Sequence, residues 1–405
     1  MKFLKRFKDI QTYYWIVFGL IILSWTFVIN KLNPSRLGVC GLFTGYILVE
    51  LGVLKLITLR KKVDLYPWLR SSFLLRRFIR MISTIIFVVT LTFFMIRLMP
   101  GNPIDIYIQG QMSSTGMSYQ EARDAAAALY QIPLDQPLYL QWLDYLWNMI
   151  HGDFGKSYTS PGTPVTKFIV DYLPWTIFSV GIGIMISFII GTVLGMYIAY
   201  KRGGFMDHAL SYFSSITTAI PNYLLGILLL ILLGVQLKLI PVSLMRGTAP
   251  PGVPAGFTFT YIAGIFGHAV LPMFTYIVST IGGWILTMKN TTLNTLGEDY
   301  VQVAKARGLK ERRIILNYVG RNAILPLFTT LVMQIGLLMG GSPLIETIFM
   351  YKGIGWAMGS ALGQRDYPVM QAIFLVITIA VIFANFMADL LYSKLDPRIK
   401  TNVTE

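Results

Sequence analysis

Long apolar runs separated by short polar segments make up most of the chain. Eight runs are long and apolar enough to cross about 30 Å of hydrocarbon as α-helices. The predicted spans are 13–30, 37–59, 81–99, 174–200, 213–235, 265–288, 326–349 and 369–392. Because charged residues fall between these runs, the pattern predicts an all-α polytopic membrane protein that lies in a lipid bilayer.

Composition agrees with this interpretation. Mean hydropathy is +0.61, and 55% of the residues are hydrophobic while only 13% are charged. The net charge is +15, but no Lys/Arg stripe is interleaved with aromatics on a soluble segment, so no nucleic-acid partner is expected. Cys40 is the single cysteine, which excludes an intrachain disulfide and a thiolate metal site.

The distribution of lysine and arginine predicts how the chain is oriented. One alternating set of connections carries 23 of these residues: 1–12, 60–80, 201–212, 289–325 and 393–405. The other set carries 9: 31–36, 100–173, 236–264 and 350–368. Since cytoplasmic loops are richer in Lys and Arg, we expect both termini in the cytoplasm and 100–173 outside.

This orientation predicts a domain organisation. Residues 1–60 form an accessory N-terminal transmembrane hairpin, and 61–80 form a basic cytoplasmic linker on the inner leaflet, where anionic lipid attracts Lys and Arg. The remainder, 81–400, contains an extracellular domain at 100–173 and a cytoplasmic loop at 289–325.

The cytoplasmic loop contains GEDYVQVAKARGLKERRIILNYVGRNAILP (297–326). Glu298 and Asp299 supply negative charge where a helix N-terminus favours it, and Gly308 follows Arg307 as a helix stop. A second helix is expected near Glu311, with an apolar face, running to Pro326. Two readings remain open from the residues alone: an ordinary positive-inside loop that is helical, or a stiff element that docks on a soluble partner.

One face of the first helix favours docking. Val301, Ala304 and Gly308 fall on one side of it and form a small-residue surface that another protein can approach closely. Basic residues surround this predicted surface.

The same stretch resembles the EAA loop of ABC importer permeases, which docks in a cleft of the ATPase subunit. DYVQVAKARGL and RNAILP are most similar to the peptide/nickel class, with Ala304, Gly308, Leu325 and Pro326 at motif positions. Gln302 and Val303 replace the Glu and Ala of the general motif, and the interval from Gly308 to Pro326 is longer than in sugar permeases.

Other blocks extend the resemblance over 73–400. In order they are MPGNP (99–103), LDQPLYLQWLDYLWNMIHGDFGKSY (134–158), GTVLGMYIAYKRGGFMDH (191–208), AIPNYLLGILLL (219–230), ETIFMYKGIG (346–355), QRDYP (364–368) and DPRI (396–399). The resemblance implies the ABC importer type I permease fold with six core spans. The N-terminal hairpin is extra to that unit, and the extracellular domain follows the first core span.

The resemblance also implies site residues and partners. The ATPase-coupling residues would be Glu298, Asp299, Tyr300, Ala304, Lys305, Arg307, Gly308, Leu309 and Glu311. Pro221, Asn222 and Glu346 would belong to the translocation path or its gate. The implied partners are two cytoplasmic ABC ATPases, a second, distinct homologous permease and an extracellular solute-binding protein, in the cell membrane. Peptides are the expected substrate, while nickel, glutathione and oligosaccharides remain alternatives.

Sequence features of nucleotide-binding proteins, metalloenzymes and ion-coupled transporters are weak or absent in the chain. HGDFGKS (151–157) is similar to a phosphate-binding loop, but Ile150 stands where that loop needs glycine, and ATP is not supplied outside. No histidine spacing predicts a catalytic zinc site, so no catalytic residue, metal or cofactor is expected, and separate subunits would hydrolyse ATP.

An ion-coupled secondary transporter needs acids within core spans, whereas Glu50 lies in the accessory hairpin. A membrane enzyme needs convergent polar groups at one depth, and the sequence predicts none.

Overall fold

The computed structural model describes residues 73–98, 103–130, 136–160, 162–241 and 246–395. These residues are helical apart from connections and one isolated bridge between Lys156 and Pro164. The chain divides into two compact units, 1–167 with 361–382 and 168–360 with 383–405. The predicted hairpin 1–60, with Glu50, lies outside the described residues, as does most of the linker 61–80.

The first unit contains a set of helices that follow the apolar pattern of the sequence. They are α4 (Phe73–Leu98), α5 (Pro103–Thr115), α6 (Tyr119–Tyr130) and α7 (Leu138–Ile150). Helix α6 begins at a capping box in which Ser118 and Glu121 bond each other's backbone amides, and these bonds lower the pKa of Glu121. Helix α7 is fixed to α4 by Trp142, whose Nε1 donates to Thr90 Oγ1 at 3.2 Å.

The turn after α7 is organised by one buried carboxylate. Asp366 is 1% exposed and accepts hydrogen bonds from the Tyr158 and Thr159 amides at 3.1 Å each, and from Ser157 Oγ at 2.5 Å. The serine of HGDFGKS is therefore bonded to a carboxylate in a turn that follows a helix. This geometry differs from the strand–loop–helix arrangement that cradles phosphate.

The second unit is built around long apolar helices. Its elements are the end of α8 (Val165–Thr176), η1 (Ile177–Gly181), α9 (Ile182–Tyr200), α10 (Phe205–Ala219), α11 (Asn222–Leu229), η2 (Leu230–Gln236), α12 (Phe259–Leu296), α16 (Leu325–Leu338), α17 (Pro343–Ile348) and most of α18 (Ile354–Gln364). Helix α19 (Tyr367–Leu395) follows. Within the described residues, three helices are long and apolar enough to cross a membrane: Val165–Tyr200, Phe259–Leu296 and Tyr367–Ala388. Two bent helix pairs, Phe205–Ala219 with Asn222–Gln236 and Glu311–Ala323 with Leu325–Leu338, pass the same test when each is taken together.

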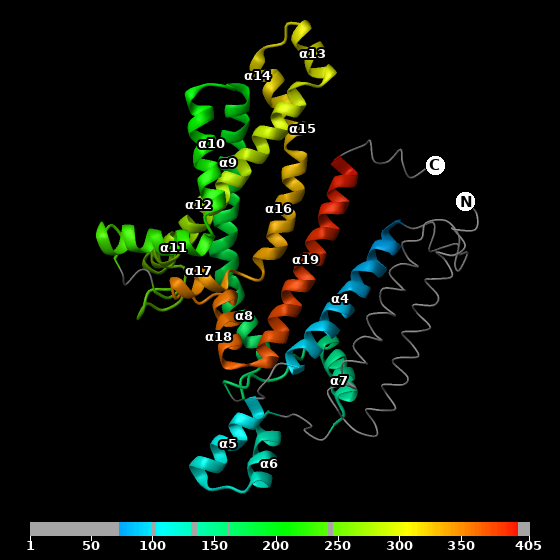
Figure 1. The fold of residues 1–405 in the computed structure, drawn as a ribbon, viewed down its shortest axis with the longest axis vertical. Coiled ribbons are helices and arrows are strands. Elements are labelled where there is room, and N and C mark those ends of the chain that lie inside the picture. The colour runs from blue at the N-terminus through cyan, green and yellow to red at the C-terminus, as the bar shows by residue number, and fades with distance from the viewer. Residues whose placement is uncertain (1–72, 99–102, 131–135, 161, 242–245, 396–405) are drawn as a thin grey trace, which may run out of the picture. The chain divides into compact units, whose positions relative to one another are not determined.

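Two predicted spans are interrupted. The span 213–235 was wrong as a single helix, because α10 and α11 meet at an angle of 103°, and Figure 1 shows α11 running across the direction of α10. Pro221 explains the break: it lacks an amide proton and excludes the helical conformation at the residue before it, and Ile220 is extended with ψ 124°.

The span 326–349 was also wrong at its end. Helix α16 stops at Leu338, and α17 begins only at Pro343. Gly341 lies between them with φ +61°, a conformation that glycine adopts without strain. Before α16, the helical segment Glu311–Ala323 meets Leu325–Leu338 at 47°.

Helices α9 and α12 approach each other backbone to backbone. A Cβ atom on Gly195 would lie 2.5 Å from the Ile285 carbonyl oxygen, and one on Gly191 would lie 2.6 Å from Trp284 Cβ. Small residues allow such contact, and in lipid close packing of this kind is a main source of helix association. Phe188 adds an edge-to-face contact with Trp284 at 5.0 Å between ring centroids.

We expect Gly195→Ala to destabilise the folded chain by about 1–3 kcal/mol, because the added methyl group has no space against the α12 backbone. The matched control is Gly283→Ala in α12, where the nearest atom to the new methyl group is Thr218 Cγ2 at 4.0 Å. Thermal unfolding of the two variants in the same detergent measures the difference. Equal unfolding temperatures would contradict the close contact between α9 and α12.

Candidate functional site

The segment 299–323 forms a compact helical element that follows α12. It comprises α13 (Asp299–Ala306), α14 (Glu311–Arg313), η4 (Ile314–Gly320) and α15 (Arg321–Ala323). Figure 1 shows α13 and α14 beyond the end of α12. The predicted helix, glycine turn and second helix are confirmed: Gly308 has φ +69°, and the second helix starts at Glu311. That helix is not a regular α-helix, because residues 314–320 adopt the wider π conformation.

This element has a small hydrophobic core of its own. Val301 and Ala304 are 0% and 2% exposed, and they pack against Ile314 and Val319. The predicted small-residue surface was therefore wrong: two of its three members face inward. An eight-residue helix has to bury its apolar side to be stable, and the second helix of the same loop covers it.

The surface that α13 presents outward lies on the opposite side. Asp299, Gln302, Val303 and Ala306 follow helical spacing and are all exposed, and Val303 is 56% exposed. We call these four residues the α13 outer face. Sequence reasoning missed Val303 and Gln302, although their departure from the general motif marked these two positions.

The predicted coupling residues divide by burial. Glu298, Asp299, Lys305, Arg307, Gly308 and Glu311 are exposed, Tyr300 and Leu309 are half-buried, and Ala304 is buried. Further exposed cations at Lys310, Arg312 and Arg313 make the surroundings of α13 basic. The α13 outer face therefore combines apolar and polar side chains and is bordered by positively charged ones.

Hydrogen bonds join the parts of this element to one another, and Leu296 at the end of α12 packs against its core. Asn322 Nδ2 donates to the Tyr300 hydroxyl at 2.8 Å and to the Tyr318 carbonyl at 2.9 Å. Gly320 in η4 lies against α9, where a Cβ atom on this glycine would be 3.0 Å from Met196 Sδ.

Glu346 lies in a second, buried polar site in the same unit. It is 0% exposed, and its carboxylate accepts hydrogen bonds from Thr176 Oγ1 and the Trp356 amide, both at 2.9 Å. Thr176 Oγ1 in turn accepts from the Ile354 amide at 2.8 Å. A Cβ atom on Gly353 would lie 2.5 Å from the Glu346 Oε2 atom, so the carboxylate is closely enclosed.

This carboxylate joins the end of α8, the short helix α17 and the start of α18. Glu346 lies outside the helices that are long enough to cross a membrane. Burial raises its pKa from 4.5 to about 7, against the opposing effect of its hydrogen bonds. Pro221 and Asn222, predicted with it as gate residues, are exposed at the bend between α10 and α11; neither is among the hydrogen-bond partners described for Glu346.

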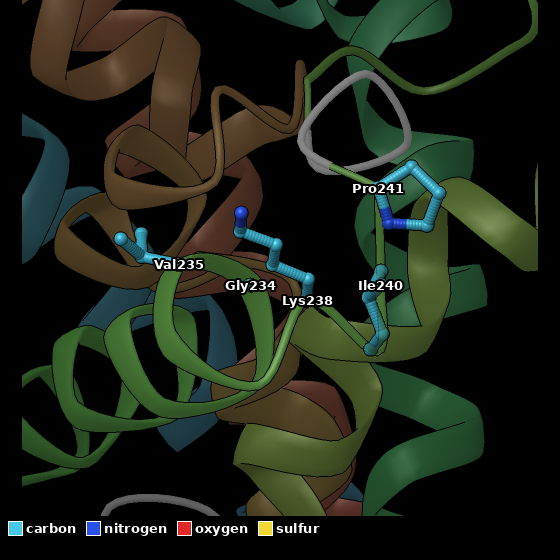
Figure 2. Close-up of a pocket in the computed structure, with 5 residues that line it drawn as sticks. All are labelled: Gly234, Val235, Lys238, Ile240 and Pro241. Carbon is cyan, nitrogen blue, oxygen red and sulfur yellow. The ribbon is translucent and has the colours of Figure 1, made fainter.

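A pocket of about 390 Å³ opens at the end of η2. It is lined by Gly234, Val235, Lys238, Ile240 and Pro241 (Figure 2). Lys238 has φ +50° and is the one charged side chain among the described residues of this lining. Among the described residues, no group of three or more His, Cys, Asp or Glu side chains is placed to hold a metal ion.

Comparison with known proteins shows the family to which the chain belongs. Residues 191–401 match the family described as "Binding-protein-dependent transport system inner membrane component". The oligopeptide transport system permease protein AppB of Bacillus subtilis is 30% identical, over 82% of this chain and 99% of the relative. The di/tripeptide transport system permease protein DppB of Pseudomonas aeruginosa is 32% identical, over 81% of this chain and 98% of the relative. The dipeptide transport system permease protein DppB of Escherichia coli is 32% identical over the same shares. Because the family match covers more than half of the chain and these relatives align over most of it, the chain belongs to the family of binding-protein-dependent transport system inner membrane components.

Proposed function

We propose that this chain is a permease subunit of an ATP-driven ABC importer and forms half of a translocation pathway for di- and oligopeptides. Relatives named as oligopeptide, di/tripeptide and dipeptide permeases, aligned over nearly their whole length, carry this proposal. Permeases of this family work with ATPase subunits and a substrate-binding protein. The pathway would be completed by a second, distinct homologous permease.

The proposed architecture has six core spans after the accessory hairpin 1–60 and the basic linker 61–80. The permease domain is 81–400, with an extracellular domain at 100–173 and the coupling loop at 289–325. The protein would lie in the plasma membrane with both termini in the cytoplasm. This orientation agrees with the excess of Lys and Arg in the connections predicted to be cytoplasmic. The external solute-binding protein delivers the peptide to the outer side.

The α13 outer face is the proposed contact with the ATPase. Val303 and Ala306 supply an apolar centre that a cleft can bury, and the exposed cations around it favour an acidic rim on the partner. Val301 and Ala304 keep α13 rigid from inside. Because this element packs against Met196 of α9 and Leu296 of α12, closure of the ATPase dimer would bias the helices between inward-open and outward-open states.

Glu346 is proposed to brace the outer gate, and the bend at Pro221 and Asn222 to lie beside the path. The support for Glu346 is that its two carboxylate oxygens accept hydrogen bonds from Thr176, 170 residues away in sequence, and from the nearby Trp356 amide. A proline-induced break in an apolar helix pair gives the chain a point where the path can change shape.

Nickel, glutathione and oligosaccharides remain alternative substrates for the same transport role. An ion-coupled secondary transporter is the alternative class, and its candidate group, Glu50, lies outside the described residues. The peptide proposal is favoured because these three relatives are all named as peptide permeases.

Peptide uptake tests the substrate directly. We expect cells that lack this chain to lose uptake of a radiolabelled tripeptide while keeping uptake of its free amino acids. Excess unlabelled dipeptide should compete in the parent cells, whereas nickel, glutathione and an oligosaccharide should not. Unchanged tripeptide uptake in the deletion strain, together with lost uptake of one of the alternatives, would replace the peptide assignment.

We expect Val303→Asp to reduce the ATPase recovered with the tagged chain by about tenfold or more, because a charge replaces the apolar centre of the contact. Phe205→Asp is the control, since Phe205 is 84% exposed but lies at the start of α10. Quantitative mass spectrometry of complexes purified in mild detergent gives the ratio of ATPase to permease. Full recovery with Val303→Asp would show that the α13 outer face is not the contact.

Glu346 predicts a pH dependence of stability. Its folded pKa of about 7 lies above the ordinary value of 4.5, so the folded state binds this proton more tightly than the unfolded state does. Stability is then highest below about pH 4.5 and falls as pH rises toward 7, by up to about 3 kcal/mol for this group. We expect Glu346→Gln to flatten that slope in thermal unfolding between pH 5 and 7.5. The exposed Asp171→Asn is the control and should keep the parent's slope; a parent-like slope in Glu346→Gln would refute the assignment.

A further inference from the structure

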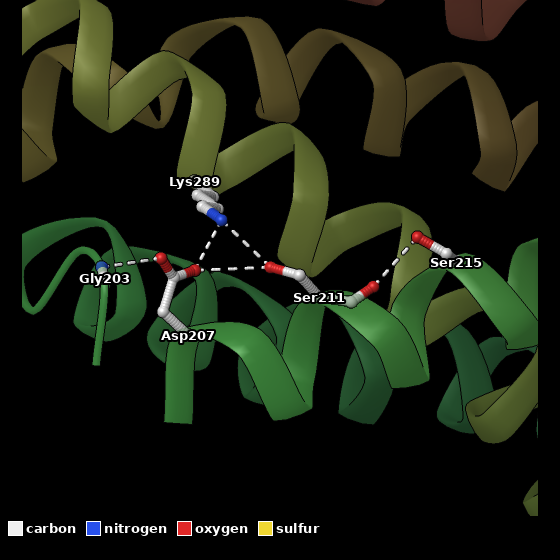
Figure 3. Close-up of polar contacts among 5 residues, drawn as sticks. All are labelled: Gly203, Asp207, Ser211, Ser215 and Lys289. Atoms are coloured by element: carbon white, nitrogen blue, oxygen red, sulfur yellow. Dashed lines mark hydrogen bonds and ion pairs between the residues drawn. The ribbon is translucent and has the colours of Figure 1, made fainter. Parts of the chain in front are cut away.

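An ion pair between a buried aspartate and a half-buried lysine joins α10 to α12 close to the end of α12 that leads into α13. Asp207 is 5% exposed, and its carboxylate pairs with Lys289 Nζ (Figure 3). The carboxylate also accepts from the Gly203 amide at 3.0 Å and from Ser211 Oγ at 3.3 Å. Lys289 donates to Ser211 Oγ at 2.9 Å. One carboxylate therefore holds the turn before α10, the first turns of α10 and the last turns of α12.

A second contact fastens the same two helices further along. A Cβ atom on Gly282 would lie 2.7 Å from the Ser214 carbonyl oxygen and 2.3 Å from Thr217 Oγ1. Ser214 is seven residues after Asp207 in α10, and Gly282 is seven residues before Lys289 in α12. Seven residues span about 10 Å of helix. The two helices thus run antiparallel, with a close backbone contact at one level and an ion pair about two turns away.

The two ends of this helix pair lead to different parts of the second unit. After Lys289, α12 runs to Leu296, and α13 starts at Asp299. After Ser214, α10 runs to the break at Pro221, where the chain turns by 103°. The fastened helix pair therefore connects the α13 outer face at one end to the bend between α10 and α11 at the other.

We propose that the Asp207–Lys289 pair positions α13 relative to α10, so that movement of α13 is carried to the bend at Pro221. This inference rests on the proposed function of α13 as the ATPase contact. Two apolar side chains of similar volume would hold the helices together without the cost of desolvating two charges. An ion pair with three further hydrogen bonds instead fixes the register of the two helices, and register is what the transmission of a movement requires.

The test uses the complete importer, purified from native membranes with its own ATPases and reconstituted into liposomes with its binding protein. Three variants are compared: Asp207→Asn, Lys289→Arg and the double variant Asp207→Asn with Lys289→Met. Radiolabelled tripeptide taken up and ATP hydrolysed are measured in the same vesicles. The readout is peptide transported per ATP hydrolysed, which is insensitive to how much complex has assembled. Arg202→Met is the control, because Arg202 is an exposed cation in the turn before α10.

We expect Asp207→Asn to lower the transport-to-ATP ratio by at least about fivefold, with ATP hydrolysis retained. Lys289→Arg keeps the charge pair and should retain most of the parent's ratio. The double variant avoids leaving a charge buried without a partner, so it assembles even where the single variant does not. It should show the same low ratio. A parent-like ratio in the double variant would overturn the proposal, since the pair would then serve stability alone.

Failure of the proposed function itself is visible separately. If the parent complex contains no ATPase, or hydrolyses ATP without moving the tripeptide, the defect lies in the assignment of the importer and its substrate. If the parent couples hydrolysis to uptake and every variant does so equally well, only the positioning role of Asp207 and Lys289 is lost.

Discussion

The second unit depends on the close approach of α9 and α12. Gly191 and Gly195 leave no space for a side chain between the two helices, and Trp284 and Ile285 of α12 occupy the position that a Cβ atom would need. In lipid, water cannot drive helices together, so dispersion contacts at short range have to supply most of the attraction. Because α12 also contacts α10 at Gly282, the placement of α10 and of the element at 299–323 follows from this contact.

Helix ends and breaks could be predicted from single residues in the sequence. Which helix faces contact one another could not, because that depends on residues far apart in the chain. Gly308 after a basic helix end, and Pro221 within an apolar run, both carry their structural meaning in the residue itself. The sequence could not show whether the apolar side of α13 meets another protein or its own loop, because Val301 and Ala304 fit either partner. The structure decides this through Ile314 and Val319, and the exposed side is then the opposite one.

Buried polar partners were still harder to anticipate. Glu346 and Thr176 are 170 residues apart, and no periodicity in either segment links them. Asp207 follows the basic segment Lys201–Arg202 in sequence, and Lys289 is the first cation of the predicted loop 289–325. Only the packing of α10 on α12 brings these charges together, and the burial of Asp207 follows from that packing.

The rigid and the bendable parts of the second unit alternate along the chain. The contacts of α9 and α10 with α12, and the small core of the element at 299–323, resist deformation because close-packed interiors do not deform smoothly. Between them lie a proline break at Pro221, a glycine break at Gly341 and the wide helical turns of η1, η2 and η4. Irregular helical turns of this kind occur often at functional sites. In a protein that must change between two states, rigid pieces preserve the direction of a movement and the breaks take up the change in angle. Asp207 and Lys289 lie within the rigid pair of α10 and α12. This pair ends at the break at Pro221, to which we propose that movement of α13 is carried.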